Sequence, residues 1–175
     1  MIRLRLATVG LALTLLSGCS TLGLLNTHED GVTIEITRDK TAYEDLIIRH
    51  EGYRRHPYPD AGGLAVGYGR NLTNNGINEA EARFLLRNDL GAVSRGLSAR
   101  FPVADRLDSA RYAAVLSMGY NLGLDGLAEF KKMWTAIEHG QYVRASSEMM
   151  LSDWCGQVGK RCIELADMMA NGKWK

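Results

Sequence analysis

The sequence predicts an α+β protein, in which a small region containing a β-hairpin precedes a larger, mostly helical region. Three patterns support this fold class. Thr41-Ala42-Tyr43-Glu44 is a capping box and predicts a helix from about Ala42 to His50. Residues 53–69 then combine prolines and glycines with strand-forming side chains, which is typical of a hairpin or small sheet. From Ser109 to Trp174 the apolar residues have helical spacing.

Helices account for most of the chain after residue 77. Asn78-Glu79-Ala80-Glu81 predicts the start of a long helix, with Gly91 and Gly96 weakening its far end. Glycines separate the later helices, which we expect at Ala110–Asn121, Leu127–His139, Tyr142–Leu151 and about Arg161–Ala170. The folded domain should therefore cover residues 41–175, after a linker at residues 28–40 that contains one short strand.

The first 27 residues have the composition of an export or membrane signal. Two arginines precede Ala7–Thr27, a run without charge. Leu16-Ser17-Gly18-Cys19 resembles a lipobox, which predicts cleavage before Cys19 and lipidation of that cysteine. The alternative is a weakly apolar anchor that stays in the membrane and is released later. Both interpretations place the folded domain in the periplasm or cell envelope, with membrane attachment through the N-terminal segment.

Length and charge limit the classes of function. The 175 residues are enough for one globular domain with a sizeable core, and we expect a monomer. The chain has 21 basic and 20 acidic side chains and a formal net charge of +1. This balance argues against a nucleic-acid partner. The histidines and cysteines lack metal-ligand spacing, so we expect no metal and no cofactor.

Two carboxylates, Glu51 and Asp60, lie nine positions apart. The first ends a helical pattern and the second lies in turn-forming sequence, so a chain reversal can bring Asp60 to face Glu51 across a cleft. Such a pair suits the hydrolysis of a sugar bond, where a sheltered acid protonates the leaving oxygen and a second carboxylate activates water or attacks the sugar. The helix end, with burial, favours protonated Glu51. The alternative is a pair of ordinary solvated carboxylates.

Several short motifs extend this pattern from about Leu46 to Trp174. They are Glu51-Gly52, Tyr58-Pro59-Asp60, Gly67-Tyr68-Gly69, Arg70-Asn71-Leu72, Met118–Gly123, Gly126-Leu127 with Phe130, Ser152-Asp153-Trp154 and Gln157–Arg161. In order and nearly in spacing, they resemble phage-type lysozymes of glycoside hydrolase family 24. The resemblance implies a lysozyme-like fold, with a small lobe, a long connecting helix, a larger helical lobe and a cleft between the lobes.

The resemblance also implies an activity, the hydrolysis of peptidoglycan glycan strands by an endolysin or a membrane-attached cell-wall lysozyme. Glu51 would be the proton donor. Asp60 would position or activate the attacking water, in an inverting cleavage of the bond between N-acetylmuramic acid and N-acetylglucosamine. Other rivals are a lytic transglycosylase, which closes an anhydro ring instead of adding water, and a non-catalytic peptidoglycan-binding homologue.

Four further residues match positions that the family uses to bind substrate. Tyr120 and Asn121 match an aromatic residue and an amide that line the saccharide groove, and core packing is the alternative for Tyr120. Arg161 matches an arginine close to the catalytic glutamate, with a solvated charge at a helix end as the alternative. Gln157 lies one turn before Arg161, where its side chain would face the sugar.

Ala65 departs from the family pattern. Relatives usually carry a threonine here that helps to hold the water, whereas alanine has no hydroxyl. Either another polar group or a backbone carbonyl orients the water, or turnover is slower by ~10²-fold. This departure is also what keeps the transglycosylase and the non-catalytic homologue as rivals.

The cysteines near the C-terminus admit two interpretations. Cys155 and Cys162 flank a glycine-containing turn, and in an oxidising compartment a disulfide between them would contribute about 2 to 3 kcal/mol. The alternative is two buried thiols. If the N-terminal segment is a releasable anchor, Cys19 would be able to exchange with one of them.

Overall fold

The computed structural model describes residues 25–27, 33–35 and 40–175. The chain divides into two units, one that ends at Asn75 and one that begins at Gly76, and each is described by itself below. The lipobox-like motif with Cys19 lies outside the described residues. Among those that are described, no helix has the length and apolarity needed to cross a membrane.

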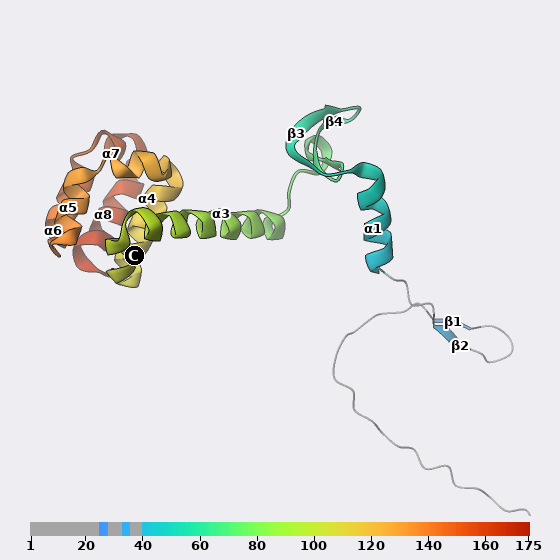
Figure 1. Cartoon of the computed structure of the whole chain (residues 1–175), viewed down its shortest axis with the longest axis horizontal. Helices are drawn as coiled ribbons and strands as arrows, with labels where there is room; N and C mark the ends of the chain where they lie inside the picture. The colour runs from blue at the N-terminus through green and yellow to red at the C-terminus, as the bar shows by residue number, and fades with distance from the viewer. Residues whose placement is uncertain (1–24, 28–32, 36–39) are drawn as a thin grey trace, which may run out of the picture. The chain divides into compact units, whose positions relative to one another are not determined.

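The first unit combines two small antiparallel sheets with two helices (Figure 1). The predicted hairpin is present, and the first helix extends two residues beyond the predicted start and one beyond the predicted end. Thr41 therefore lies within this helix, and the capping box predicted there is wrong. The elements are β1 (Leu25–Thr27) paired with β2 (Thr33–Glu35), α1 (Lys40–Glu51), the three-stranded sheet β3 (Arg54–Asp60), β4 (Gly63–Gly67) and β5 (Arg70–Asn71), and α2 (Leu72–Asn75).

The end of α1 is set by glycine. Gly52 adopts a φ of 68°, in the left-handed region, and its N–H donates to the carbonyl of Ile48 over 3.1 Å. A residue with a Cβ is strained in that conformation, whereas glycine satisfies the last turn without cost and redirects the chain. Glu51 is therefore the last residue of α1, as predicted.

The register of the hairpin determines which residues of the sheet are neighbours. Asp60 pairs with Gly63 next to the turn, and Tyr58 pairs with Ala65. On its other edge β4 pairs with β5, which places Asn71 opposite Ala65. An irregularity between Arg54 and Tyr58 accommodates Pro57, which has no N–H to donate to the ladder.

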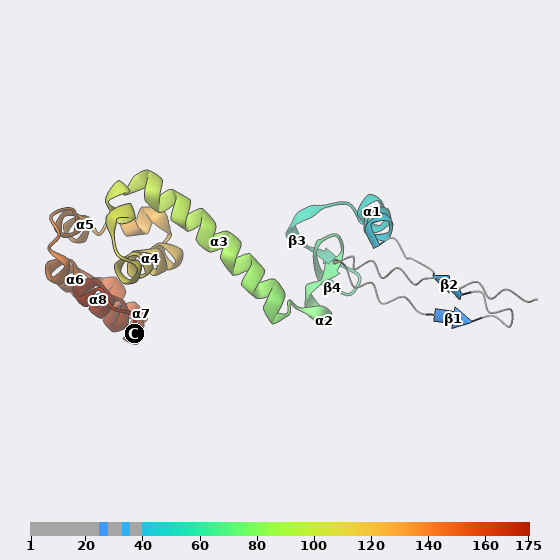
Figure 2. The ribbon, with the colours of Figure 1, turned by 90° about the horizontal axis from the view of Figure 1, so that it is seen from below.

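The second unit is entirely helical, and α4 to α8 gather around the C-terminal end of α3 (Figures 1 and 2). Its elements are α3 (Glu79–Arg100), the 3-10 helix η1 (Pro102–Arg106), α4 (Ser109–Ala128), α5 (Lys131–Glu138), α6 (Tyr142–Met150), α7 (Asp153–Val158) and α8 (Lys160–Asn171). The core contains Leu97, Met118, Leu127, Met133, Ile137, Met149 and Met169, all of them buried.

The start of α3 follows the sequence and its far end does not. Asn78 accepts a hydrogen bond from the N–H of Glu81 over 2.9 Å, and the Glu81 side chain accepts one from the N–H of Asn78 over 2.8 Å, which completes the predicted capping box. The expected weakening at the glycines is wrong, because α3 continues to Arg100. A methyl group on Gly96 would lie 2.1 Å from Leu124 Cδ1, so Gly96 permits close packing of α3 against α4.

The single helix expected at Leu127–His139 is also wrong. α4 continues to Ala128, bends at Gly123 where φ is 70°, and α5 begins at Lys131. The chain turns between them so that the Trp134 ring folds back and its Nε1–H donates to the carbonyl of Leu127 over 3.1 Å. The short helix α7 was not predicted, although Ser152 caps it by accepting from the N–H of Cys155 over 3.3 Å.

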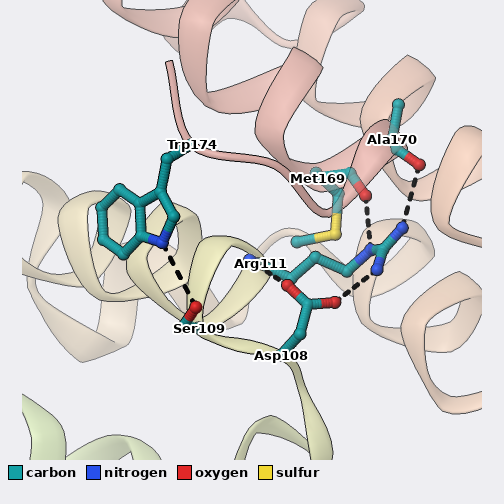
Figure 3. Close-up of polar contacts among 6 residues, drawn as sticks. All are labelled: Asp108, Ser109, Arg111, Met169, Ala170 and Trp174. Atoms are coloured by element: carbon teal, nitrogen blue, oxygen red, sulfur yellow. Dashed lines mark hydrogen bonds and ion pairs between the residues drawn. The ribbon is translucent and has the colours of Figure 1, made fainter.

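One arginine holds the C-terminal helix to the start of α4 (Figure 3). Arg111 donates to the carbonyls of Met169 over 2.8 Å and Ala170 over 3.0 Å, in the last turn of α8. It also pairs with Asp108, and its guanidinium lies 3.9 Å from the centre of the Tyr142 ring. We refer to these contacts as the Arg111 clamp. They satisfy carbonyls that a helix end leaves without intrahelical partners.

Candidate active site

Glu51 stands at the junction of helix and sheet in the first unit. Its side chain is exposed, so the first unit does not supply the burial that was expected for Glu51. The carboxylate rests against the turn between β4 and β5, where a methyl group on Gly69 would lie 3.0 Å from Glu51 Oε2. Gly69 has a φ of 76°, so glycine is needed there both for the backbone conformation and for the space that the carboxylate occupies. The structure thus fixes where the Glu51 carboxylate lies relative to the sheet.

Asp60 ends β3 at the hairpin turn. Its Oδ1 accepts a hydrogen bond from the N–H of Ala61 over 2.9 Å, and the side chain is exposed. Its other oxygen, Oδ2, has no hydrogen-bond donor among the described residues, which leaves it available to water. One oxygen of the Asp60 carboxylate is therefore held by the backbone, which orients the side chain, and the other oxygen can bind water.

A network of short polar side chains supports the hairpin turn from beneath. Asn71 Nδ2 donates to the carbonyl of Gly62 over 3.1 Å, and Asn71 Oδ1 accepts from the N–H of Asn74 over 2.8 Å. Thr73 Oγ1 accepts from the N–H of Leu64 over 2.9 Å. These bonds tie α2 to the turn that carries Asp60. This network was not predicted from the sequence, although the polar residues Asn71, Thr73 and Asn74 directly after the hairpin are a signal for it.

Ala65 is completely buried between its partners on β3 and β5. A side chain at this position points into the interior of the first unit and has no contact with solvent. Ala65 consequently supplies neither a hydroxyl nor a water-accessible surface.

Tyr120 and Asn121 lie in the second unit, on α4. The Tyr120 side chain is exposed by 44%, which argues against the core position weighed as the alternative. Asn121 Oδ1 accepts a hydrogen bond from Trp154 Nε1 over 2.8 Å, while Trp154 is buried and packs edge-on against Phe130. This contact orients the Asn121 amide and leaves its NH₂ group as the donor available to a ligand.

Gln157 and Arg161 lie on α7 and α8, on either side of Gly159. Gln157 is exposed. Arg161 is half-buried, and its Nη2 donates to the carbonyl of Ser117 over 3.1 Å and to the Ser117 hydroxyl over 2.9 Å. This side chain is therefore anchored to α4 and is not a solvated charge at a helix end.

A disulfide joins Cys155 on α7 to Cys162 on α8. Their Cα atoms are 5.1 Å apart, and the bridge closes the turn that carries Gln157 and Arg161. Cys162 is buried. The interpretation of these residues as two separate thiols is thus not what the structure contains.

Residues 48–167 match the phage lysozyme family. The chain belongs to that family. The match contains the two carboxylates, Ala65 and the four substrate-binding candidates of this phage lysozyme family member. It runs from the end of α1 through most of α8, and so covers the three-stranded sheet of the first unit and most of the second unit.

Three relatives illustrate the range of proteins that this family member resembles. It is 25% identical over 154 residues to the pre-baseplate central spike protein Gp5 of Enterobacteria phage T4. It is 22% and 21% identical to two proteins of Dictyostelium discoideum, probable T4-type lysozymes 2 and 1. The alignments use 83%, 77% and 83% of this chain, and they cover 27%, 97% and 91% of the relatives. The chain thus spans about a quarter of the spike protein and nearly all of each lysozyme.

One pocket on the second unit was not anticipated. It has a volume of about 480 Å³ and lies between the start of α5 and the end of α6, lined by Glu129, Phe130, Lys131, Lys132, Met133, Glu148, Leu151 and Ser152. Phe130 connects this pocket to Trp154 and hence to Asn121. In the described part of the chain, no three His, Cys, Asp or Glu side chains are grouped so that they could hold a metal ion.

Proposed function

We propose that this protein is a muramidase, a glycosidase that hydrolyses the β-1,4 bond between N-acetylmuramic acid and N-acetylglucosamine in peptidoglycan. The observation that carries the proposal is the placement of Glu51 and Asp60 at the ends of adjacent elements, α1 and β3, in a member of the phage lysozyme family. Each carboxylate is held by its own local structure, and each is open to solvent and substrate.

The proposed mechanism gives the two carboxylates opposite tasks. Glu51 transfers its proton to the glycosidic oxygen as the bond to the leaving sugar breaks. Asp60, through the oxygen that does not bind Ala61, accepts a proton from a water molecule whose oxygen attacks the anomeric carbon. The configuration of that carbon is inverted, and two chains result, one with a new reducing end. Tyr120, Asn121, Gln157 and Arg161 supply the aromatic, amide and cationic groups that bind the sugars.

The test is lysis of outer-membrane-stripped bacteria by the full chain, with Glu51→Gln, Asp60→Asn and Glu44→Gln compared at equal concentration. Glu44 is an exposed carboxylate on the same helix as Glu51 and serves as the matched control. General acid catalysis contributes about 10²- to 10⁴-fold, so Glu51→Gln should lose activity to that extent. Glu44→Gln should retain full activity. Unchanged lysis by Glu51→Gln would overturn the acid assignment.

A lytic transglycosylase is the second candidate, because Ala65 is buried and has no hydroxyl to hold a water. The two reactions leave different chain ends. Digestion of purified peptidoglycan followed by mass spectrometry should give reducing ends that are heavier by one water than anhydromuramic ends. A product that consists of anhydromuramic ends would replace the hydrolase by the transglycosylase.

We further propose that the enzyme acts in the cell envelope, attached through its N-terminal segment. The uncharged run with the lipobox-like motif supports export, and a disulfide fits an oxidising compartment. Mass spectrometry of the protein extracted from membranes distinguishes a chain that begins at a lipidated Cys19 from one that keeps Met1. Recovery of the full-length protein from the cytosol alone would contradict this localisation.

A further inference from the structure

The half-buried guanidinium of Arg161 is held by a serine of another helix. Arg161 Nη2 donates to the hydroxyl of Ser117 over 2.9 Å and to the carbonyl of the same residue over 3.1 Å. Both acceptors belong to α4, whereas Arg161 is the second residue of α8. Hydrogen bonds from a charged donor are stronger than those between neutral groups, so these two bonds fix the direction in which the guanidinium points.

Ser117 lies on the same face of α4 as two of the substrate-binding candidates. Tyr120 and Asn121 follow it by three and four positions, and residues with these spacings are neighbours on the surface of a helix. The Tyr120 side chain is exposed, and the Asn121 amide is oriented by the indole of Trp154. The hydroxyl of Ser117 therefore holds the cation of α8 about one helical turn from the aromatic and amide groups of α4.

Three links join α4, α7 and α8 into a closed arrangement, which we refer to as the three-helix frame. Ser117 connects α4 to Arg161 of α8, and Asn121 connects α4 to Trp154 of α7 over 2.8 Å. The disulfide connects α7 to α8, and its two cysteines directly follow Trp154 and Arg161 in the chain. Because each helix is linked to both of the others, none can shift alone, and the position of Arg161 is set before any ligand binds.

The same contacts leave hydrogen-bond donors available to a ligand. Arg161 uses Nη2 for both bonds to Ser117, and its Nε and Nη1 have no acceptor among the described residues. The NH₂ group of Asn121 is available in the same way, since Asn121 Oδ1 is the atom that binds Trp154. The hydroxyl and N-acetyl oxygens of a glycan accept hydrogen bonds from such groups. The three-helix frame thus presents oriented donors from two helices to a glycan strand.

We propose that Ser117 is a positioning residue that fixes Arg161 for glycan binding. This inference rests on the proposed function, and Ser117 acts through the guanidinium without contact to the sugar. When the Ser117 hydroxyl is removed, Nη2 keeps only the carbonyl as an acceptor, and the Arg161 side chain gains rotational freedom. Binding must then restrict that side chain again, so the affinity for glycan falls by more than the rate of the chemical step.

The experiment is a double-mutant cycle of Ser117→Ala and Arg161→Met in the full chain, with kcat and KM measured separately on purified peptidoglycan. Ser117→Ala should raise KM by about 3- to 10-fold and change kcat by less than about twofold. Arg161→Met should raise KM by about 10- to 100-fold, and Ser117→Ala added to it should have no further effect. Ser94→Ala is the matched control and should keep the KM of the parent, because the hydroxyl of this half-buried serine is hydrogen-bonded to Tyr112 over 2.6 Å and not to Arg161.

A KM that Ser117→Ala leaves unchanged, or that Ser94→Ala raises as much, would overturn the proposal. So would an effect of Ser117→Ala that is as large in Arg161→Met as in the parent, because Ser117 would then act without Arg161. The same cycle in the Glu51→Gln chain, followed by co-sedimentation with insoluble peptidoglycan, should raise the Kd by the same factors. If Glu51→Gln leaves lysis intact, the hydrolase assignment fails, whereas the co-sedimentation measurements still decide the role of Ser117.

Discussion

The Arg111 clamp should be the largest single polar contribution to the stability of the second unit. Replacement of Arg111 by Met keeps an unbranched apolar stem and removes the guanidinium. The side chain is exposed by only 15%, so solvent replaces few of its contacts. The variant loses two hydrogen bonds from a charged donor to the end of α8 and the contact with the Tyr142 ring.

The expected magnitude follows from these contacts. Hydrogen bonds that involve a charged group contribute about 1.5 to 3 kcal/mol each, and a cation–π contact contributes about 0.5 to 2 kcal/mol. The two carbonyls lie at a helix end, where water regains part of their bonding, so we expect a net loss of about 3 kcal/mol. For a unit of this size that loss lowers the unfolding midpoint by roughly 10 to 20 °C.

The assay is urea denaturation of the full chain at neutral pH, followed by circular dichroism. Arg83→Met is the matched control, because Arg83 forms an ion pair with Glu79 along α3 in which both side chains are largely exposed. Such surface pairs contribute about 0 to 1 kcal/mol. A loss below about 1 kcal/mol in Arg111→Met, or a loss as large in Arg83→Met, would refute the reasoning from buried charge-assisted hydrogen bonds.

Three further predictions concern stability. Replacement of both Cys155 and Cys162 by Ala should lower the free energy of unfolding by about 2 to 3 kcal/mol, and reductant should lower that of the parent protein by the same amount. An unfolding midpoint of the parent that does not change with reductant would contradict the disulfide. For Asp108, burial acts to raise the pKa, but the hydrogen bonds and charge of Arg111 outweigh it and hold the pKa below its ordinary value. The parent should thus be more stable than Asp108→Asn at neutral pH. This difference in stability should disappear as the pH falls below about 4 and through the lowered pKa of Asp108 in the folded state. If the stability of the two proteins depends on pH in the same way, the ionised Asp108 carboxylate does not contribute to it. Gly172→Ala should cost about 1 to 2 kcal/mol, because Gly172 ends α8 with a φ of 65°, whereas Gly156→Ala, within α7 and with open space around it, should be neutral or slightly stabilising; similar thermal midpoints for both variants would refute the conformational argument.

Local signals in the sequence were sufficient to predict helix ends at which a capping residue satisfies the backbone. Two such signals satisfy backbone groups within their own stretch of chain, and these are the capping box at Asn78 and Glu81 and the glycine after Glu51. Their neighbours along the chain therefore decide the conformation. Ser152 is a signal of the same kind, and the helix it caps was available to the same reasoning.

Boundaries set by packing were not available to that reasoning. Gly96 remains helical because Leu124 of another helix needs the space beside it. The break between Ala128 and Lys131 forms because Trp134 folds back onto the carbonyl of Leu127. Neither residue carries a local signal for these outcomes, since a glycine normally weakens a helix and a tryptophan normally continues one.

The candidate site also combines residues predicted from local sequence with contacts that only the packing of the helices shows. The residue types and their spacing predicted Glu51 and Asp60 as the candidate pair, because the proposed chemistry requires an acid and a base. The contacts that orient Asn121 and Arg161 come from Trp154 and Ser117, which are 33 and 44 positions away. Their partners follow from how the helices pack and could not be read from spacing.

The sequence by itself determined the fold class and the family and predicted the two candidate carboxylates, because each depends on local conformational preference or on motifs that are contiguous in the chain. Only the tertiary structure decided that position 65 is sealed inside the first unit, that the Thr73 hydroxyl lies over Gly63, and that Arg111 holds the two ends of the helical unit together. The physical reason is that hydrogen bonds and close packing join atoms by their separation in space, and separation along the chain does not determine that distance.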